Sequence, residues 1–163
     1  MKRATRQRLG LLIGVAALLG LAGWQWQHDS AAAPGALLDL DPAAISRVAV
    51  QLGHGPAEDY LRRDGHWWRA DAPAVRADDG RLDELAATAR APVLAWRAAA
   101  DFDPAKIGLA PPQATLRLDG RELTFGETAV TGPQRYVRVG DRVALVPERY
   151  MPRPALAQTT RAH

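Results

Sequence analysis

The sequence contains no cysteine. This absence excludes disulfide bonds, thiolate metal sites and cysteine nucleophiles. It also excludes a bacterial lipoprotein, whose lipid is carried on a cysteine just after the apolar leader. Serine occurs only as Ser30 and Ser46, and neither lies in the G-x-S-x-G turn that exposes a hydrolase nucleophile. The sequence therefore predicts neither a thiol enzyme nor a serine hydrolase.

Metal-ligand spacings are also lacking. The four histidines are scattered, at His28, His54, His66 and His163. Only His54 has a carboxylate four residues on, Glu58, and the intervening glycine and proline disfavour the helix that would put both on one face. Clustered carboxylates occur at Glu58-Asp59, Asp78-Asp79, Asp83-Glu84 and Asp101-Phe102-Asp103. Helix capping and solvent exposure account for each, so we predict no catalytic residue, no metal site and no cofactor.

Outside the first eight residues, the positive and negative charges of the chain nearly balance. The whole chain has a net charge of +3, from 21 Lys+Arg and 18 Asp+Glu. Residues 1–8 hold four of the basic residues and none of the acidic ones, which leaves 17 against 18, a net charge of −1. The two signs are interspersed, as on an ordinary solvated surface. The composition therefore argues against nucleic-acid binding.

A long apolar run does occur, at Leu9 to Trp26. As a helix rising ~1.5 Å per residue it would be about 27 Å long, close to the ~30 Å hydrocarbon core of a bilayer. Trp24 and Trp26 close the run, where indole rings favour the headgroup region. Basic residues precede it, and such residues keep that end in the cytoplasm. We therefore predict a transmembrane helix over 9–26, after a cytoplasmic segment 1–8.

The rest of the chain divides into three parts. Residues 27–37 are small and polar and predict a linker. Residues 38–150 are predicted to form one α+β domain. Residues 151–163 are rich in proline and are predicted to be a flexible tail. Abundant Ala, Arg, Gly and Pro are typical of a GC-rich bacterial genome, so the domain is expected in the periplasm and the anchor in the inner membrane. The alternative is a cleaved signal peptide, with Ser30-Ala31-Ala32 as the cleavage site.

Alternating apolar residues and turn pairs predict an antiparallel sheet. In Ile45 to Leu52 the apolar residues recur at every second position, as in a half-buried strand. Hairpins are expected around Asp64-Gly65, Asp119-Gly120 and Gly140-Asp141, because tight hairpin turns need residues that tolerate positive φ. A further strand is predicted at Val93 to Ala98.

One main helix is expected between the first hairpin and that further strand. Asp78 or Asp79 can cap it, and Pro92 ends it. The apolar residues at helical spacing are Leu82, Leu85, Ala86 and Ala89. A capped helical turn is predicted over 101–109, with Asp103 as the N-cap and Gly108 as the terminator. The order of elements predicts an α+β domain of antiparallel hairpins with one main helix.

Several of these pieces together resemble a known family. In chain order they are Gly65 and Trp67, the helix around Leu82 and Leu85, Gly108-Leu109-Ala110-Pro111-Pro112, Phe125-Gly126, Tyr136-Val137 and Val143 to Val146. The chain is similar here to the domain of unknown function 4340 family, except that Phe125 stands where the family has an aliphatic residue. Its members are typically membrane-tethered envelope proteins, some beside ABC-type transporter components. The resemblance implies a location and an assembly role, but no activity and no catalytic residues.

Tryptophans and arginines are the candidates for a binding surface. Side chains of adjacent strand residues point to opposite faces, so one of Trp67 and Trp68 should be buried and the other accessible. We predict Trp67 in the core, at the family's G-x-W position. Trp68, with Arg62 and Arg69, is the predicted binding surface; the alternative is that the second indole packs under a loop and the arginines are only solvated.

These observations leave function open between classes. The first hypothesis is a non-enzymatic, single-pass inner-membrane protein whose periplasmic domain binds another envelope component, as an accessory of a transporter or of envelope assembly. The alternative is a periplasmic module that binds a glycan or a lipid headgroup. An enzymatic function is the third hypothesis. A deep pocket with convergent polar groups would favour a ligand or an enzyme, and a flat apolar patch a protein partner.

Overall fold

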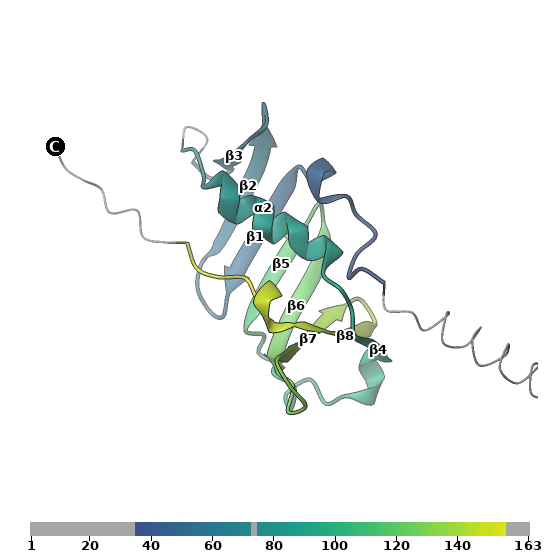
Figure 1. Cartoon of the computed structure of the whole chain (residues 1–163). Coiled ribbons are helices and arrows are strands. Elements are labelled where there is room, and N and C mark those ends of the chain that lie inside the picture. Colours follow the sequence, from purple (N-terminus) through teal and green to yellow (C-terminus); the bar gives the residue numbers. More distant parts are fainter. Residues whose placement is uncertain (1–34, 73–74, 156–163) are drawn as a thin grey trace, which may run out of the picture. The chain divides into compact units, whose positions relative to one another are not determined.

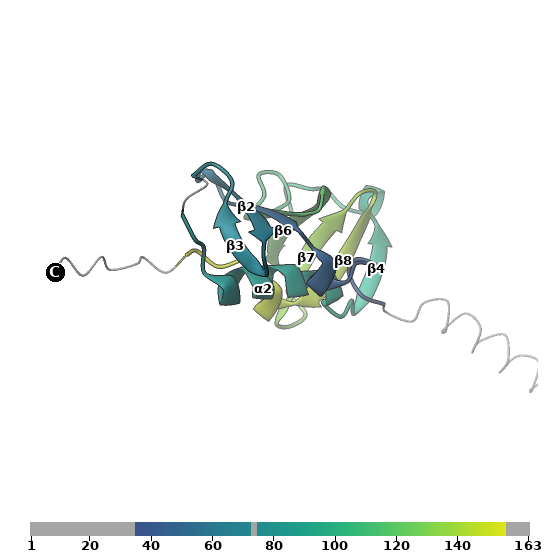
Figure 2. The same ribbon diagram turned by 90° about the horizontal axis from the view of Figure 1, so that it is seen from above.

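The computed structural model describes residues 35–72 and 75–155. Within them eight antiparallel strands form one sheet in the order β3-β2-β1-β5-β6-β7-β8-β4 (Figure 1). The strands are β1 Arg47–Leu52, β2 Ala57–Arg63, β3 His66–Arg69, β4 Ala95–Ala98, β5 Ala114–Leu118, β6 Arg121–Thr128, β7 Gln134–Val139 and β8 Arg142–Pro147. The helix α2, Asp79–Ala87, lies along one face, and Figure 2 shows β3 and β4 at the two ends of the sheet. The short 3-10 helices in these ranges are η1 Pro42–Ala44, η2 Thr88–Arg90, η3 Ala99–Asp101 and η4 Glu148–Tyr150.

The prediction of an α+β domain of antiparallel hairpins with one main helix is confirmed for this part of the chain. None of the described helices has the length and apolar character needed to cross a bilayer. The predicted cytoplasmic segment 1–8, transmembrane helix 9–26 and most of the predicted linker lie outside the described residues.

The predicted turns are confirmed by their backbone angles. Asp64 and Gly65 have φ of 51° and 78°, and Asp119 and Gly120 have 46° and 84°, so both residues of each turn are left-handed. Asp119 has a second role, because its carboxylate accepts hydrogen bonds from the backbone N–H groups of Ser46 at 3.1 Å and Arg47 at 2.8 Å. The β5–β6 turn thereby fixes the start of β1.

The main core lies between α2 and one face of the sheet. The strand predicted at 45–52 alternates as expected, with Val48 and Val50 buried. Asp78 caps α2 by accepting a hydrogen bond from the backbone N–H of Arg81, and Leu82 and Leu85 on the helix are buried. Across the sheet, the buried residues that share this face include Trp67, Leu116, Leu123, Phe125, Val137 and Val146. The predicted helix and its buried positions are thus confirmed.

A second, smaller cluster covers part of the opposite face. The loop between β4 and β5 places Ile107 and Leu109 against Val143 of β8, with Phe102 and Tyr136 beside them. Gly108 has a φ of 68°, as predicted for a terminator. The segment before it is a series of turns rather than a helix, although Asp103 does accept from the backbone N–H of Ala105 as a cap would.

This cluster gives a first prediction. Leu109→Ala should lower the free energy of unfolding by about 2–4 kcal/mol, because a buried leucine is removed from a site that the surrounding loop fills only partly after truncation. Leu109 is 8% exposed. Leu94→Ala is the control, since Leu94 is 48% exposed and should change stability by less than about 0.5 kcal/mol. Urea unfolding followed by circular dichroism measures both; equal midpoints would show that Leu109 does not stabilise the loop.

The ends of the domain extend slightly beyond the predicted limits of 38–150. Leu37, predicted as the last linker residue, is buried and donates its backbone N–H to the carbonyl of Ala91. At the other end, the first residues predicted as tail lie beside α2. There the Nη2 and Nε atoms of Arg81 donate to the carbonyl oxygen of Arg153 at 3.2 and 3.4 Å. Ala95–Ala98 is the observed strand within the predicted segment 93–98.

Candidate binding site

The two adjacent tryptophans lie on opposite faces of β3, as predicted. Trp67 is 1% exposed and packs under α2, where its Nε1 donates to the carboxylate of Asp83 at 2.9 Å. Trp68 is half-buried on the other face, opposite Leu61 of β2. The prediction that Trp67 is the core residue is confirmed.

Trp68, Arg62 and Arg69, the predicted binding surface, do not lie on one face of the sheet. Arg62 pairs with Trp67 across the β2–β3 ladder, and Arg69 follows Trp67 by two residues, so both arginines lie on the face of Trp67 rather than that of Trp68. That grouping was wrong because it did not apply strand alternation to the arginines.

Both arginines are also held by neighbours. The guanidinium of Arg62 lies 4.5 Å from the centre of the Trp67 ring, bonds the Asp83 carboxylate and donates to the carbonyl of Ala43 at 2.8 Å. Arg69 makes two hydrogen bonds to the carboxylate of Asp71, at 2.9 and 2.6 Å. Each guanidinium thus already has a carboxylate partner, which a ligand would have to replace or share. Arg62 thereby ties β2 to α2, and Arg69 ties the end of β3 to the residues that follow it.

The clustered carboxylates have structural partners as well. Asp79 accepts the backbone N–H of Trp67 at 2.7 Å and a hydrogen bond from Arg76 at 2.8 Å, and the Nδ1 of His66 lies 2.8 Å from the same carboxylate. Arg76, the Trp67 amide and His66, in that order, hold the pKa of Asp79 well below its ordinary value. Its place in the first turn of α2 favours the negative charge further.

This cluster predicts an acid-sensitive contribution to stability. Because the pKa of Asp79 is lowered on folding, its stabilising effect is present above the unfolded-state pKa of about 3.9 and is lost as the pH falls. Asp79→Asn should therefore lower Tm near neutral pH and reduce the fall in Tm on acidification. The control is Asp141→Asn, an exposed turn residue. If the Tm of Asp79→Asn and that of wild type fall in parallel from about pH 7 to 3, protonation of Asp79 does not account for the acid sensitivity.

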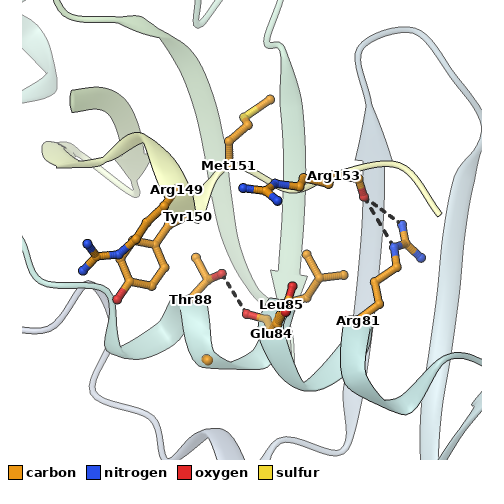
Figure 3. Close-up of a pocket in the computed structure, with 9 residues that line it drawn as sticks. Arg81, Glu84, Leu85, Thr88, Arg149, Tyr150, Met151 and Arg153 are labelled. Atoms are coloured by element: carbon orange, nitrogen blue, oxygen red, sulfur yellow. Dashed lines mark hydrogen bonds between the residues drawn. The ribbon is translucent and has the colours of Figure 1, made fainter. Parts of the chain in front are cut away.

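A groove lies between α2 and the segment that follows β8 (Figure 3). Its volume is ≈ 280 Å³. Leu85 and Thr88 line it from the helix side, and Tyr150 and Met151 line it from the C-terminal segment. Leu85 is 5% exposed and Thr88 2%, so this part of the helix surface is almost closed to solvent. The accessible apolar surface of the groove, here called its floor, therefore comes from Ala87, Tyr150 and Met151, which are exposed or half-buried.

The charged side chains of the groove are of two kinds. Arg81 is a structural residue: it donates to Glu58 at 3.1 Å and to the Tyr60 hydroxyl at 3.2 Å, besides holding the Arg153 carbonyl. In the part of the chain that the structure describes, Arg149 and Arg153 take part in no ion pair. The groove thus presents two uncompensated guanidinium groups beside an apolar floor.

The two arginines differ in their surroundings. Arg149 stacks on its neighbour, with its guanidinium carbon 5.0 Å from the centre of the Tyr150 ring. Arg153 is fixed through its backbone, while its side chain extends toward Met151 in Figure 3. Glu84, also exposed, lies on the helix wall and makes no ion pair within the described ranges. The rim therefore carries positive charge on the C-terminal segment and one negative charge on the helix.

Sequence reasoning missed this groove because its walls come from distant parts of the chain. Residues 151–163 were predicted as a flexible tail from their prolines, and Arg149 and Arg153 were not singled out. A signal was present, since Tyr150 and Met151 are large apolar residues directly after the last strand and such residues favour burial. What the sequence does not contain is the position of this segment beside α2.

Comparisons with known proteins found no matching family model, no matching curated protein and no matching solved structure. The resemblance to the domain of unknown function 4340 family therefore stays a prediction. In the described ranges, no group of three or more His, Cys, Asp or Glu side chains is arranged to hold a metal ion.

Proposed function

We propose that this chain is a non-enzymatic, single-pass inner-membrane protein whose periplasmic domain binds another component of the cell envelope, in the groove between α2 and residues 149–153. The location rests on the basic residues before the apolar run 9–26. One observation carries the binding role: Arg149 and Arg153, which form no ion pair within the described residues, lie in one groove beside the apolar surface of Tyr150 and Met151. Arg97 and Arg121 on the sheet form no ion pair within the described residues either, so what distinguishes Arg149 and Arg153 is their position in the groove and not the missing pairing alone.

A protein partner is favoured over a glycan because of what covers the aromatic rings. Glycan recognition uses the open face of an aromatic side chain. Here Trp96 is covered by Arg142 at 4.2 Å and Tyr150 by Arg149 at 5.0 Å, whereas no arginine stacks on Trp68 within the described residues, so it is the first two rings that are covered. A ring already stacked by a guanidinium would have to lose that contact before a sugar could replace it. An apolar floor with a charged rim suits a protein surface, in which both kinds of group occur together.

The location has a direct test. A reporter that is active only in the periplasm, fused to the C-terminus, should be active, and sequencing the mature protein should return its original N-terminus. A mature chain that begins near residue 33 would replace the anchor by a cleaved signal peptide and leave the periplasmic location intact. A reporter that is active only in the cytoplasm would contradict the proposed location.

The binding role is tested by comparing three versions of the full chain. Each is crosslinked in cells, purified from membranes and analysed by quantitative mass spectrometry: wild type, Arg149→Gln with Arg153→Gln, and the control Arg97→Gln with Arg121→Gln. The control arginines are also exposed but lie on β4 and β6. We expect an envelope component to be lost from the first double variant alone. Identical sets in all three would contradict a binding role for the groove.

A further inference from the structure

The size of the groove limits what it can hold. Typical small-molecule sites have volumes of roughly 300–1,000 Å³ and enclose most of their ligand. At ≈ 280 Å³, between α2 and the segment formed by η4 and the residues after it, this groove lies at the lower end of that range and has room for one or two side chains. A flat membrane surface would reach the rim arginines but not the apolar side chains inside the groove. An extended peptide reaches both.

The charges then select the chemistry of the peptide. Each guanidinium has five N–H donors, so Arg149 and Arg153 together offer ten. Within the described part of the chain the one recorded contact of these two groups is the stacking of Arg149 on the Tyr150 ring. Guanidinium groups pair with carboxylates in bidentate, charge-assisted hydrogen bonds. Glu84 on the opposite wall repels a second carboxylate there, so it fixes which side of the groove the acidic groups occupy.

From these contacts we propose that the groove binds an extended acidic segment of a partner protein, in which carboxylates alternate with apolar side chains. The carboxylates pair with Arg149 and Arg153, and an apolar side chain lies on the floor against Tyr150 and Met151. This proposal rests on the proposed function and names the chemistry of the partner.

A labelled peptide gives the test. The probe is a fluorescein-labelled hexapeptide of alternating glutamate and leucine, and its control replaces every glutamate by glutamine. Fluorescence anisotropy with the full-length protein in zwitterionic detergent should show saturable binding of the acidic peptide. Binding should weaken about tenfold or more in the Arg149→Gln, Arg153→Gln variant, since bonds to charged groups are the strong ones. It should also weaken as salt is raised.

Matched measurements make the result decisive. The Arg97→Gln, Arg121→Gln variant should bind like wild type, and circular dichroism should show the same fold and Tm for all three proteins. The proposal is overturned if the glutamine peptide binds equally well, if the control variant loses as much affinity, or if no saturable binding is seen up to about 1 mM. It is also overturned if soluble short-chain phosphatidylglycerol binds through these arginines and the peptide does not.

This test is separable from that of the proposed function. If the peptide fails while the Arg149→Gln, Arg153→Gln variant still loses an envelope component in cells, the groove binds a partner of other chemistry. If both fail, the groove is not a binding site.

Discussion

Replacing Trp67 by alanine is expected to lower the free energy of unfolding by about 3–5 kcal/mol, the usual range for a buried aromatic residue. The side chain is 1% exposed and lies between the sheet and α2. Its loss would also leave Asp83 without the Nε1 donor and remove the ring on which Arg62 stacks. Urea unfolding should be followed by circular dichroism, because the substitution removes a fluorophore.

Trp68→Ala is the matched control for this measurement. Trp68 is the next residue on the same strand, but it is half-buried on the face away from α2. Its truncation removes less contact and should cost far less than that of Trp67. Equal and large destabilisation by both substitutions would mean that both indoles belong to a core, contrary to the alternation described here.

The second large effect is expected at Gly126. A Cβ atom at this position would lie 2.2 Å from the carbonyl oxygen of Ile107, and the backbone there is held by a hydrogen bond from Glu127 to the same oxygen. Gly126→Ala should therefore cost about 3 kcal/mol through a forced backbone shift. Gly108 faces a similar restriction, because its Cβ would lie 2.4 Å from the Cγ of Glu127 and its φ is 68°.

Gly35→Ala is the control for this prediction, since a Cβ at Gly35 would have nothing within 4 Å. It should leave stability within about 0.5 kcal/mol of wild type. Thermal and urea unfolding measure both variants. Should Gly126→Ala unfold at the wild-type midpoint, the β4–β5 loop does not approach β6 as closely as described.

Local chemistry explains what could be predicted from the sequence. The turns at Asp64-Gly65 and Asp119-Gly120 need positive φ, and few residue pairs supply it. Alternation predicted the burial of Val48 and of one of the two adjacent tryptophans, because the period of a strand is two, and the resemblance to the G-x-W position selected Trp67. The cap at Asp78 follows from the donors that the first turn of any helix leaves free. Each of these depends on a few consecutive residues.

What could not be predicted depends on contacts between distant residues. The two glycines of the family-like motifs, Gly108 and Gly126, are explained by one close contact between the β4–β5 loop and β6, which spacing alone does not reveal. One wall of the groove is the segment after β8, whose Arg153 carbonyl accepts from Arg81, 72 residues earlier in the chain. The grouping of Trp68 with Arg62 and Arg69 was a different kind of error, since alternation applied to Arg69 would have placed it with Trp67.

The most direct test of the binding groove is site-specific photocrosslinking in cells. Ala87 lines the groove and is exposed, so it is the test position. Gln51 is the control position: it is exposed on β1, next to the buried Val50, and does not line the groove. A photoreactive amino acid at Ala87 should form a discrete crosslink to an envelope protein, which disappears when Arg149→Gln and Arg153→Gln are added, and Gln51 should give none. Crosslinks of equal yield from both positions, or an Ala87 crosslink that survives removal of the two arginines, would contradict the groove as the binding site.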